Sequence, residues 1–219
     1  MRKTAKINLA VACLALVAGG AQAATQGGYA GAGLGYSKLQ TPDSFISTDS
    51  FIQSVDEQRQ RGGLGGRVFG GYNFNQYVGL EAGFSQYAKS QYNSQIVASD
   101  VNFAGFAQYT MSALDLVGKA YLPLGETGFN VYALGGAALM ISKTRGNISY
   151  QGTVLSSETS RQNTVRPKFG LGASYAIPAT KLTTSVEWSR IQGKGNVKND
   201  IRALPNADMA TFNISYNFS

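Results

Sequence analysis

Some charged residues of this chain occupy positions from which they could act together. They lie within segments where apolar and polar residues alternate, on the side opposite to the apolar residues. Two neighbouring carboxylates can serve as general acid and base, and opposite charges can pair. The chain has no histidine, the usual general base of serine-dependent hydrolysis, so we expect ion pairs and no catalytic residues. The candidate charge network comprises Arg67, Glu81, Asp115, Lys119, Arg166, Lys168 and Glu187.

No feature of the sequence predicts a metal or a cofactor. The chain has no histidine and a single cysteine, Cys13, although these residue types are the preferred ligands of zinc. The polar segment 40–61 contains an acidic group that could bind calcium weakly, but a solvated loop explains this group better. Its members are Asp43, Asp49, Asp56 and Glu57.

The first 23 residues have the features of a secretory signal peptide. A basic start is followed by a nearly continuous apolar run over residues 7–17, and Ala21-Gln22-Ala23 has the small-x-small pattern of a cleavage site. Cys13 lies inside the apolar run, which continues past it, so lipid attachment at this cysteine is disfavoured. We expect a cleaved signal at 1–23 and one domain at 24–219, which crosses the inner membrane and uses no disulfide.

Side chains alternate with period two over eight segments, which indicates eight strands. The alternation is apparent in the hairpin 65–85, where Val68, Gly70 and Tyr72 share one face and Arg67 shares the other with glycine. Segment 129–141 is apolar on both faces, so alternation does not orient it, and we expect Val131, Ala133, Leu139 and Ile141 to face outward. Besides the two arms of the hairpin, the predicted strands are 28–38, 111–122, 129–141, 164–177, 181–191 and 209–218.

Long and short connections alternate between these strands. Long polar connections lie at 40–61, 87–109, 142–163 and 192–205, and short turns lie near Asn75, Gly125 and Ala179. Parts of 87–109 could instead extend the flanking strands beyond the membrane. An even number of antiparallel strands with this pattern is typical of bacterial outer-membrane barrels. Strands of about ten residues match the tilted span of a bilayer.

A soluble eight-stranded barrel is the alternative fold, and it would need an apolar interior. The charged side chains of the candidate network would then point into a sealed apolar cavity, and burying unpaired charges costs much free energy. The sequence therefore predicts an all-β protein of the bacterial cell outer membrane, an eight-stranded antiparallel transmembrane β-barrel with four long extracellular loops and three short periplasmic turns. Its last strand must pair with its first, because unpaired backbone groups are very costly in lipid. Aromatic residues on the predicted outward faces suit the two interfaces, and these are Tyr36, Tyr72, Tyr175, Trp188 and Tyr216.

Four strand motifs resemble the OmpA-like transmembrane domain family: GGYNFNQYVGLEAGF, VGKAYLPL, GLGASYAIP and MATFNISYNF. The resemblance implies insertion by the outer-membrane assembly machinery, with the terminal aromatic Phe218 as assembly signal, although here Ser219 follows it. The best-known members carry a peptidoglycan-binding domain after the barrel. Because this chain stops at Ser219, we expect that function to be absent.

The family's barrel interior holds an ion-pair network proposed as a gate. Glu81 and Lys119 match two of its members, whereas Ser174 and Ser185 stand at the positions of the other partners. The resemblance thus implies a network that is incomplete or rewired. The residues available for rewiring are Arg67, Lys168 and Glu187.

Two functions remain open from the sequence. The first is envelope structure and surface interaction through the loops, which carry the aromatic residues Tyr87, Tyr92, Phe103, Phe106 and Tyr150. The alternative is a small gated pore, because glycine and serine on the inner faces could leave water cavities between salt bridges in an otherwise filled interior. We expect as partners outer-membrane lipid and lipopolysaccharide, the assembly machinery, and a host or surface ligand at the loops. A net charge of +7, with three of the cations in the predicted signal, does not suggest nucleic acid.

Overall fold

The computed structural model describes residues 26–40, 54–60, 62–98, 101–125, 127–150, 153–193 and 205–218. Within them all regular structure is strand, and no helix there is long and apolar enough to cross a membrane. The strands are β1 (Gly27–Gln40), β2 (Ser54–Gln60), β3 (Gly62–Asn73), β4 (Val78–Gln86), β5 (Ser90–Ala98), β6 (Val101–Pro123), β7 (Phe129–Tyr150), β8 (Thr153–Ala176), β9 (Leu182–Ile191) and β10 (Asn206–Asn217).

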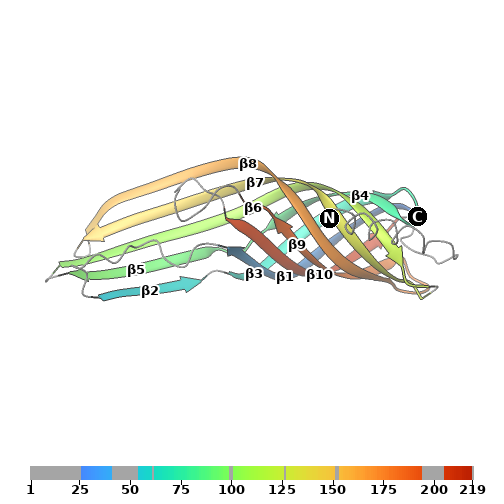
Figure 1. Cartoon of the computed structure of the whole chain (residues 1–219), viewed down its shortest axis with the longest axis horizontal. Coiled ribbons are helices and arrows are strands. Elements are labelled where there is room, and N and C mark those ends of the chain that lie inside the picture. The colour runs from blue at the N-terminus through green and yellow to red at the C-terminus, as the bar shows by residue number, and fades with distance from the viewer. Residues whose placement is uncertain are drawn as a thin grey trace, which may run out of the picture.

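Eight of the strands form a closed antiparallel barrel. The ring runs β6-β4-β3-β1-β10-β9-β8-β7, and pairing of β6 with β7 closes it. The first and last strands pair along their whole length, from Tyr29 opposite Asn217 to Gln40 opposite Asn206. Figure 1 shows the tilted strands of the ring. Closure pairs the backbone groups that would otherwise face lipid, and the predicted eight-stranded barrel is confirmed.

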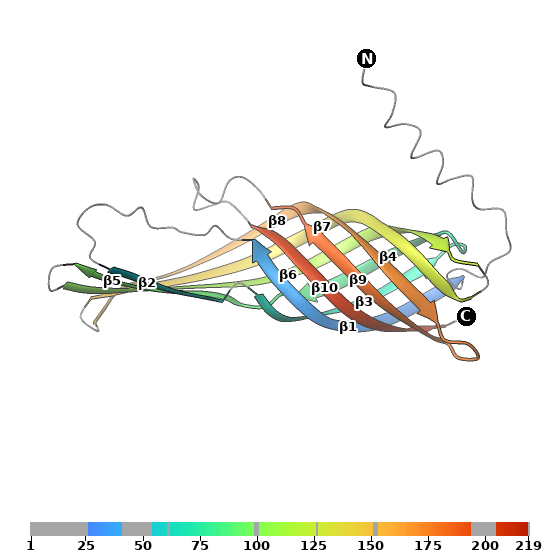
Figure 2. The same cartoon turned by 60° about the horizontal axis from the view of Figure 1, so that its bottom comes forward.

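A second region continues the sheet beyond one rim of the barrel. Strands β6, β7 and β8 contain 23, 22 and 24 residues, about twice the length of β9 and β10. Beyond the ring, β6 pairs with β5, and β5 pairs with β2. We call this region the outer sheet: β2, β5, and residues 101–109 of β6, 142–150 of β7 and 153–163 of β8. In Figures 1 and 2 it extends away from one end of the barrel.

The outer sheet corrects the prediction of loops at 87–109 and 142–163. These segments are polar, but they contain many Thr, Tyr, Val and Ile residues, which favour strands. Their register continues that of the barrel, and β7 pairs with β8 from Phe129 opposite Tyr175 to Tyr150 opposite Thr153. Of the predicted loop 40–61, residues 54–60 form β2. Residues 41–53 and 194–204 lie outside the described part of the chain.

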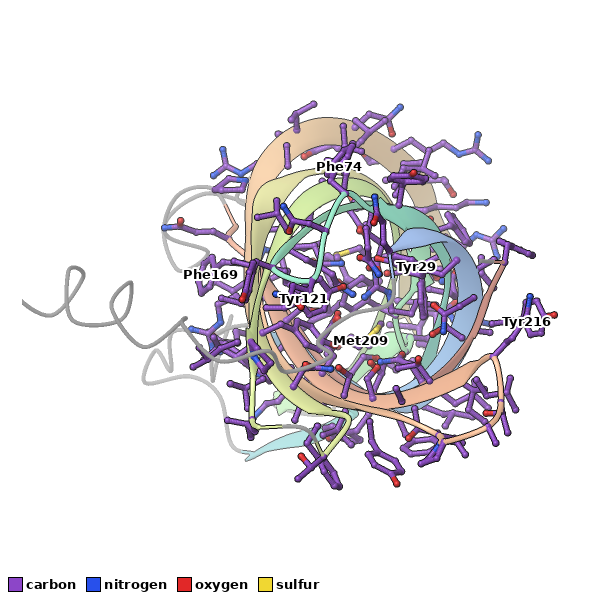
Figure 3. All side chains as sticks on the ribbon, turned by 90° about the vertical axis from the view of Figure 1, so that its right-hand side faces the viewer. Tyr29, Phe74, Tyr121, Phe169, Met209 and Tyr216 are labelled. Atoms are coloured by element: carbon purple, nitrogen blue, oxygen red, sulfur yellow. The ribbon has the colours of Figure 1, made fainter. Side chains whose placement is uncertain are left out.

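Alternation along the strands separates an apolar outside from a different inside. Leu34, Val165 and Leu171 are more than 60 % exposed on the outer wall. On β7, Val131 and Ala133 face outward while Tyr132 and Leu134 are buried, as predicted. In Figure 3, Tyr29, Tyr121 and Met209 lie within the ring, and Phe169 and Tyr216 lie outside it. An apolar outer band is typical of membrane barrels.

Three short turns join strands at the end opposite the outer sheet. At the first, the Asn75 side chain accepts hydrogen bonds from the N–H groups of Tyr77 and Val78 at 2.8 and 2.9 Å, which is an Asx turn. The second turn contains Gly125 and Gly128 at φ values of 67° and 76°, and the third contains Ala179 at 59°. All three predicted turns are confirmed.

Candidate functional site: the charged lumen

Six of the seven candidate charges meet inside the barrel. They come from five strands, and each is at most 6 % exposed. Inward positions on neighbouring strands bring them to one level, because the side-chain period of two directs every second residue to the lumen. We call this group the lumen network, and its members are Arg67 (β3), Glu81 (β4), Asp115 and Lys119 (β6), Lys168 (β8) and Glu187 (β9).

Arg67 is at the centre of the lumen network. Its Nη2 lies 2.9 Å from Glu81 Oε1 and 3.4 Å from Asp115 Oδ1. Its Nη1 donates to Glu187 Oε1. Gly83 leaves room for this guanidinium, because a Cβ there would lie 2.9 Å from Nη2. One cation therefore joins carboxylates from three strands.

The two lysines complete the charge balance. Lys119 Nζ lies 2.5 Å from Glu81 Oε2 and 3.6 Å from Glu187 Oε2. Lys168 Nζ lies 2.8 Å from Asp115 Oδ2. Three cations thus face three carboxylates, and each carboxylate contacts two cations. A buried charge must be paired to be tolerated, and this arrangement pairs all six.

Aromatic side chains cover the network toward the short turns. The hydroxyls of Tyr29 and Tyr132 donate to Glu81 Oε2 and Glu187 Oε2, each at 3.0 Å. Lys119 Nζ lies 4.7 Å from the Tyr132 ring centroid, within the range of a cation–π contact. A Cβ at Gly71 would lie 2.6 Å from the Tyr29 hydroxyl, and one at Gly172 would lie 2.5 Å from that of Tyr132. These inner-face glycines therefore make room for large side chains, whereas the sequence suggested water cavities at them.

Arg166 lies apart from the lumen network. Its guanidinium donates to the backbone oxygens of Gln192, at 3.2 Å, and Gly193. These residues directly follow β9, where that strand stops at the rim. Arg166 therefore ties the end of β9 to β8 and does not meet the other candidate charges.

An apolar layer fills the lumen between the network and the outer sheet, and sequence reasoning missed it. We call it the apolar plug. Met140 and Ile191 are 0 % exposed, and Tyr87, predicted as an exposed loop residue, is 3 % exposed within it. The alternation along β6 indicates this layer, because Met111 and Ala113 lie on the same inward face as Asp115. The buried members are Leu39, Tyr87, Met111, Ala113, Ala138, Met140, Ile191, Ala207 and Met209.

The candidate interface aromatics lie on the outer wall. Tyr36, Tyr72, Trp188 and Tyr216 are between 39 and 57 % exposed. Tyr175 is half-buried and stacks on Phe129, with ring centroids 4.4 Å apart. Tyr72, Tyr175 and Tyr216 lie near the short turns, while Tyr36 and Trp188 lie toward the other end of their strands. Their role as membrane anchors stays a prediction.

Phe218, the predicted assembly signal, lies exposed on the outer wall. Its N–H donates to Gly28 O at 2.9 Å, which extends the pairing of the chain ends by one residue.

Several predictions fall outside what the structure describes. They concern the signal at 1–23 with Cys13, the acidic residues Asp43 and Asp49, and the side chains of Asp56, Glu57, Tyr92, Phe103 and Tyr150. Phe106 is half-buried on β6. In the described part of the chain, no three potential metal-ligating residues come together.

A closed eight-stranded barrel with an apolar outside and an ion-paired inside defines a class of membrane protein, the small outer-membrane barrels. The chain belongs to the family described as "Outer membrane protein beta-barrel domain", which it matches over residues 9–218. It is therefore a non-enzymatic barrel of the bacterial outer membrane.

Curated relatives include outer membrane protein A of Salmonella typhi, 30 % identical over 220 residues, which cover 100 % of this chain and 56 % of the relative. An uncharacterised protein of Coxiella burnetii is 29 % identical, over 87 % of this chain and 83 % of that protein. The chain thus spans little more than half the length of the outer membrane protein A sequences that it matches.

Two solved structures have a similar arrangement at low sequence identity. Neisserial surface protein A is 14 % identical, with a TM-score of 0.49, over 87 % of this chain and 97 % of that one. Ail of Yersinia pestis, solved in complex with the heparin analogue sucrose octasulfate, is 14 % identical, with a TM-score of 0.44, over 88 % and 99 %.

Proposed function

We propose that this protein supports the envelope and presents an interaction surface outside the cell, with the barrel acting as a rigid base. The observation that carries this proposal is the contrast between the two ends of the long strands. Inside the ring the lumen network and the apolar plug occupy successive levels. Beyond the ring, β2, β5, β6, β7 and β8 continue as the outer sheet.

The filling of the lumen argues for a supporting role. An eight-stranded barrel has an interior just wide enough for side chains, and here ion pairs and buried methionines occupy it. A solute would have to separate paired charges and also displace the plug. Both steps oppose free passage through the barrel.

The outer sheet argues for surface interaction. Short turns lie on the periplasmic side of such barrels and long segments on the cell exterior. Binding residues are commonly displayed on segments that a rigid scaffold positions. We expect lipopolysaccharide and a host or surface ligand as partners here, insertion through the assembly machinery with Phe218 as signal, and removal of residues 1–23 during export.

A shortened hairpin tests this role. Thr144 and Ser160 face each other in the β7–β8 register, so a four-residue turn can replace residues 145–159 without disturbing the barrel. Bacteria producing this variant at the wild-type level should lose adhesion to host cells while the barrel remains folded and inserted. Unchanged adhesion would overturn the proposed surface role.

A small gated pore is the second candidate, and one observation favours it. Glu81 and Glu187 each contact both Arg67 and Lys119, so the ion pairs have alternative partners and could exchange. If the barrel conducts, Lys119→Ala should change the single-channel current. An unchanged current would contradict a gate centred on Lys119.

A further inference from the structure

Three cations lie together on the outward face of β7 and β8. Lys143 is directly opposite Arg161, and Arg145 follows Lys143 by two residues on the same face of β7. Side chains directly opposite each other in an antiparallel pair have Cβ atoms about 5 Å apart. We call Lys143, Arg145 and Arg161 the outer-face cluster.

The outer-face cluster begins where the lipid-facing band ends. Going outward along the β7–β8 register, Leu139 faces Val165, Ile141 faces Asn163, and Lys143 faces Arg161. The apolar band of an outer-membrane barrel ends at the interface with the headgroups. The three cations are therefore at the level of the headgroups of the outer leaflet.

No ion pair with a carboxylate is found for any member of the cluster among the residues whose side chains the structure describes, which leave out 148–158. The residues of β6 opposite Lys143 and Arg145 are Thr110 and Gln108, which are uncharged. The positive charge of Arg145, together with partial desolvation and the charge of Arg161, lowers the pKa of Lys143.

The adjoining part of the barrel rim, formed by β9, β10 and β1, provides an acidic partner for an outward cation. There Arg190 Nε lies 2.6 Å from Asp208 Oδ1, and Lys38 is opposite the same aspartate in the β1–β10 register. Arg190 is thus paired with a carboxylate where β9 and β10 meet, whereas no ion pair is described for the cations of the cluster.

Protection of an exposed sheet edge does not account for the cluster. In the described part of the chain, the ladder of β8 with β9 ends at Lys168 opposite Ile191, followed by a hydrogen bond from the Gln192 N–H to Pro167 O. Charges on an unpaired sheet edge prevent sheet-to-sheet aggregation. That explains Arg161. Lys143 and Arg145 lie on β7, between β6 and β8, where no edge needs protection.

We propose that the outer-face cluster binds phosphate groups of lipopolysaccharide in the outer leaflet. Arginine offers a planar pair of donors to a phosphate, and lysine adds a compact charge. This site deepens the proposed surface role and rests on it for the placement of the outer sheet outside the cell. It does not require adhesion or any host ligand.

The test is the affinity of the folded full-length chain for purified, fluorescently labelled lipopolysaccharide in zwitterionic detergent. The test variant is Lys143→Gln/Arg145→Gln/Arg161→Gln. Each cation near an anionic lipid surface contributes roughly a factor of five, so we expect the triple variant to bind about 100-fold more weakly. Wild-type protein should bind chemically dephosphorylated lipopolysaccharide about as weakly as the variant binds the intact form.

A matched variant removes three exposed lysines elsewhere, Lys38→Gln/Lys89→Gln/Lys181→Gln, and should keep near wild-type affinity. Heat-shifted gel mobility establishes that each variant is folded, so loss of binding is separable from loss of the barrel. Equal loss in both variants would overturn the site in favour of general charge attraction. Wild-type affinity in the test variant would also overturn it, as would binding of heparin but not lipopolysaccharide through the cluster. Because adhesion is measured separately, failure here leaves the proposed surface role intact.

Discussion

The lumen network and the outer-face cluster are both groups of strand-borne charges, yet they differ in balance. The lumen network contains three cations and three carboxylates within ion-pair distance. The outer-face cluster contains three cations, and no carboxylate pairs with them among the residues whose side chains the structure describes. Buried charges must be neutralised inside the fold, whereas water tolerates unbalanced charges at the surface. Balance therefore indicates a structural role for the first group, and imbalance leaves the second available to a ligand.

Removal of Arg67 should lower the stability of the barrel more than any other change considered for these two groups of charges. Arg67→Met leaves three buried carboxylates with only Lys119 and Lys168. Breaking a buried ion pair from one side costs about 3–5 kcal/mol, so we expect unfolding in urea to become easier by this amount. The single tryptophan, Trp188, reports unfolding from lipid vesicles by fluorescence.

Arg190→Met is the control for this experiment. Arg190 pairs with Asp208 at the rim, where its side chain is 31 % exposed. Exposed pairs contribute about 0–1 kcal/mol. Similar losses in the two variants would mean that burial does not distinguish the lumen network from a surface pair.

The apolar plug should show a smaller but substantial effect. Met140 is fully buried, and replacement of a buried methionine by alanine costs about 2–5 kcal/mol. Met140→Ala should therefore lower the free energy of unfolding in urea within that range. A change below about 0.5 kcal/mol, the usual size for surface substitutions, would show that the plug is loosely packed.

Charge reversal at the outer-face cluster should have a small effect of opposite sign. Lys143→Glu replaces two like charges that face each other across β7 and β8 by an opposite pair, and opposite charges directly across an antiparallel pair are favourable. We expect unchanged or slightly raised stability in urea, together with weaker binding of lipopolysaccharide. A destabilised variant would mean that the cluster is held by contacts of its own.

The pH dependence of the cluster should be the smallest effect. The positive charge of Arg145 and of Arg161 lowers the pKa of Lys143 in the folded chain. At pH values between this lowered pKa and the ordinary pKa of lysine, the unfolded chain therefore binds more protons than the folded chain. Stability contributed by this position should therefore rise as pH increases through that window. Amide protection factors of the β7–β8 hairpin, in which the base-catalysed rise of intrinsic exchange is divided out, should increase over this interval in the wild type and not in Lys143→Gln. Equal behaviour of the two proteins would contradict repulsion within the cluster.

Much of the barrel followed from sequence because its two faces lie in different media. Lipid on one side and packed charges on the other impose alternation, which locates residues such as Leu171 and Glu187 without any structure. The apolar plug was missed because inward residues were expected to be polar or charged, although the expected outward position of Leu139 already implied that Met140 points inward. Most of the outer sheet was missed because polar composition was interpreted as loop.

The sequence predicted which residues belong to the lumen network better than it predicted how they are arranged. Alternation along the strands identified Arg67 and Glu187 as inward residues, and the family resemblance indicated an altered ion-pair network around Glu81 and Lys119. The central place of Arg67 depends on the relative stagger of five strands and on the room left by Gly83. Stagger arises from long-range pairing, which a single sequence does not display. Arg166 shares the inward parity but lies at the rim, where β9 has ended.

Planar-bilayer conductance of the refolded barrel tests the central claim most directly. If the lumen network and the apolar plug together fill the interior, a folded barrel with a heat-shifted gel band should produce no discrete current steps. Discrete, reproducible steps from the same preparation would contradict a filled lumen and would make the gated pore the better account of this protein.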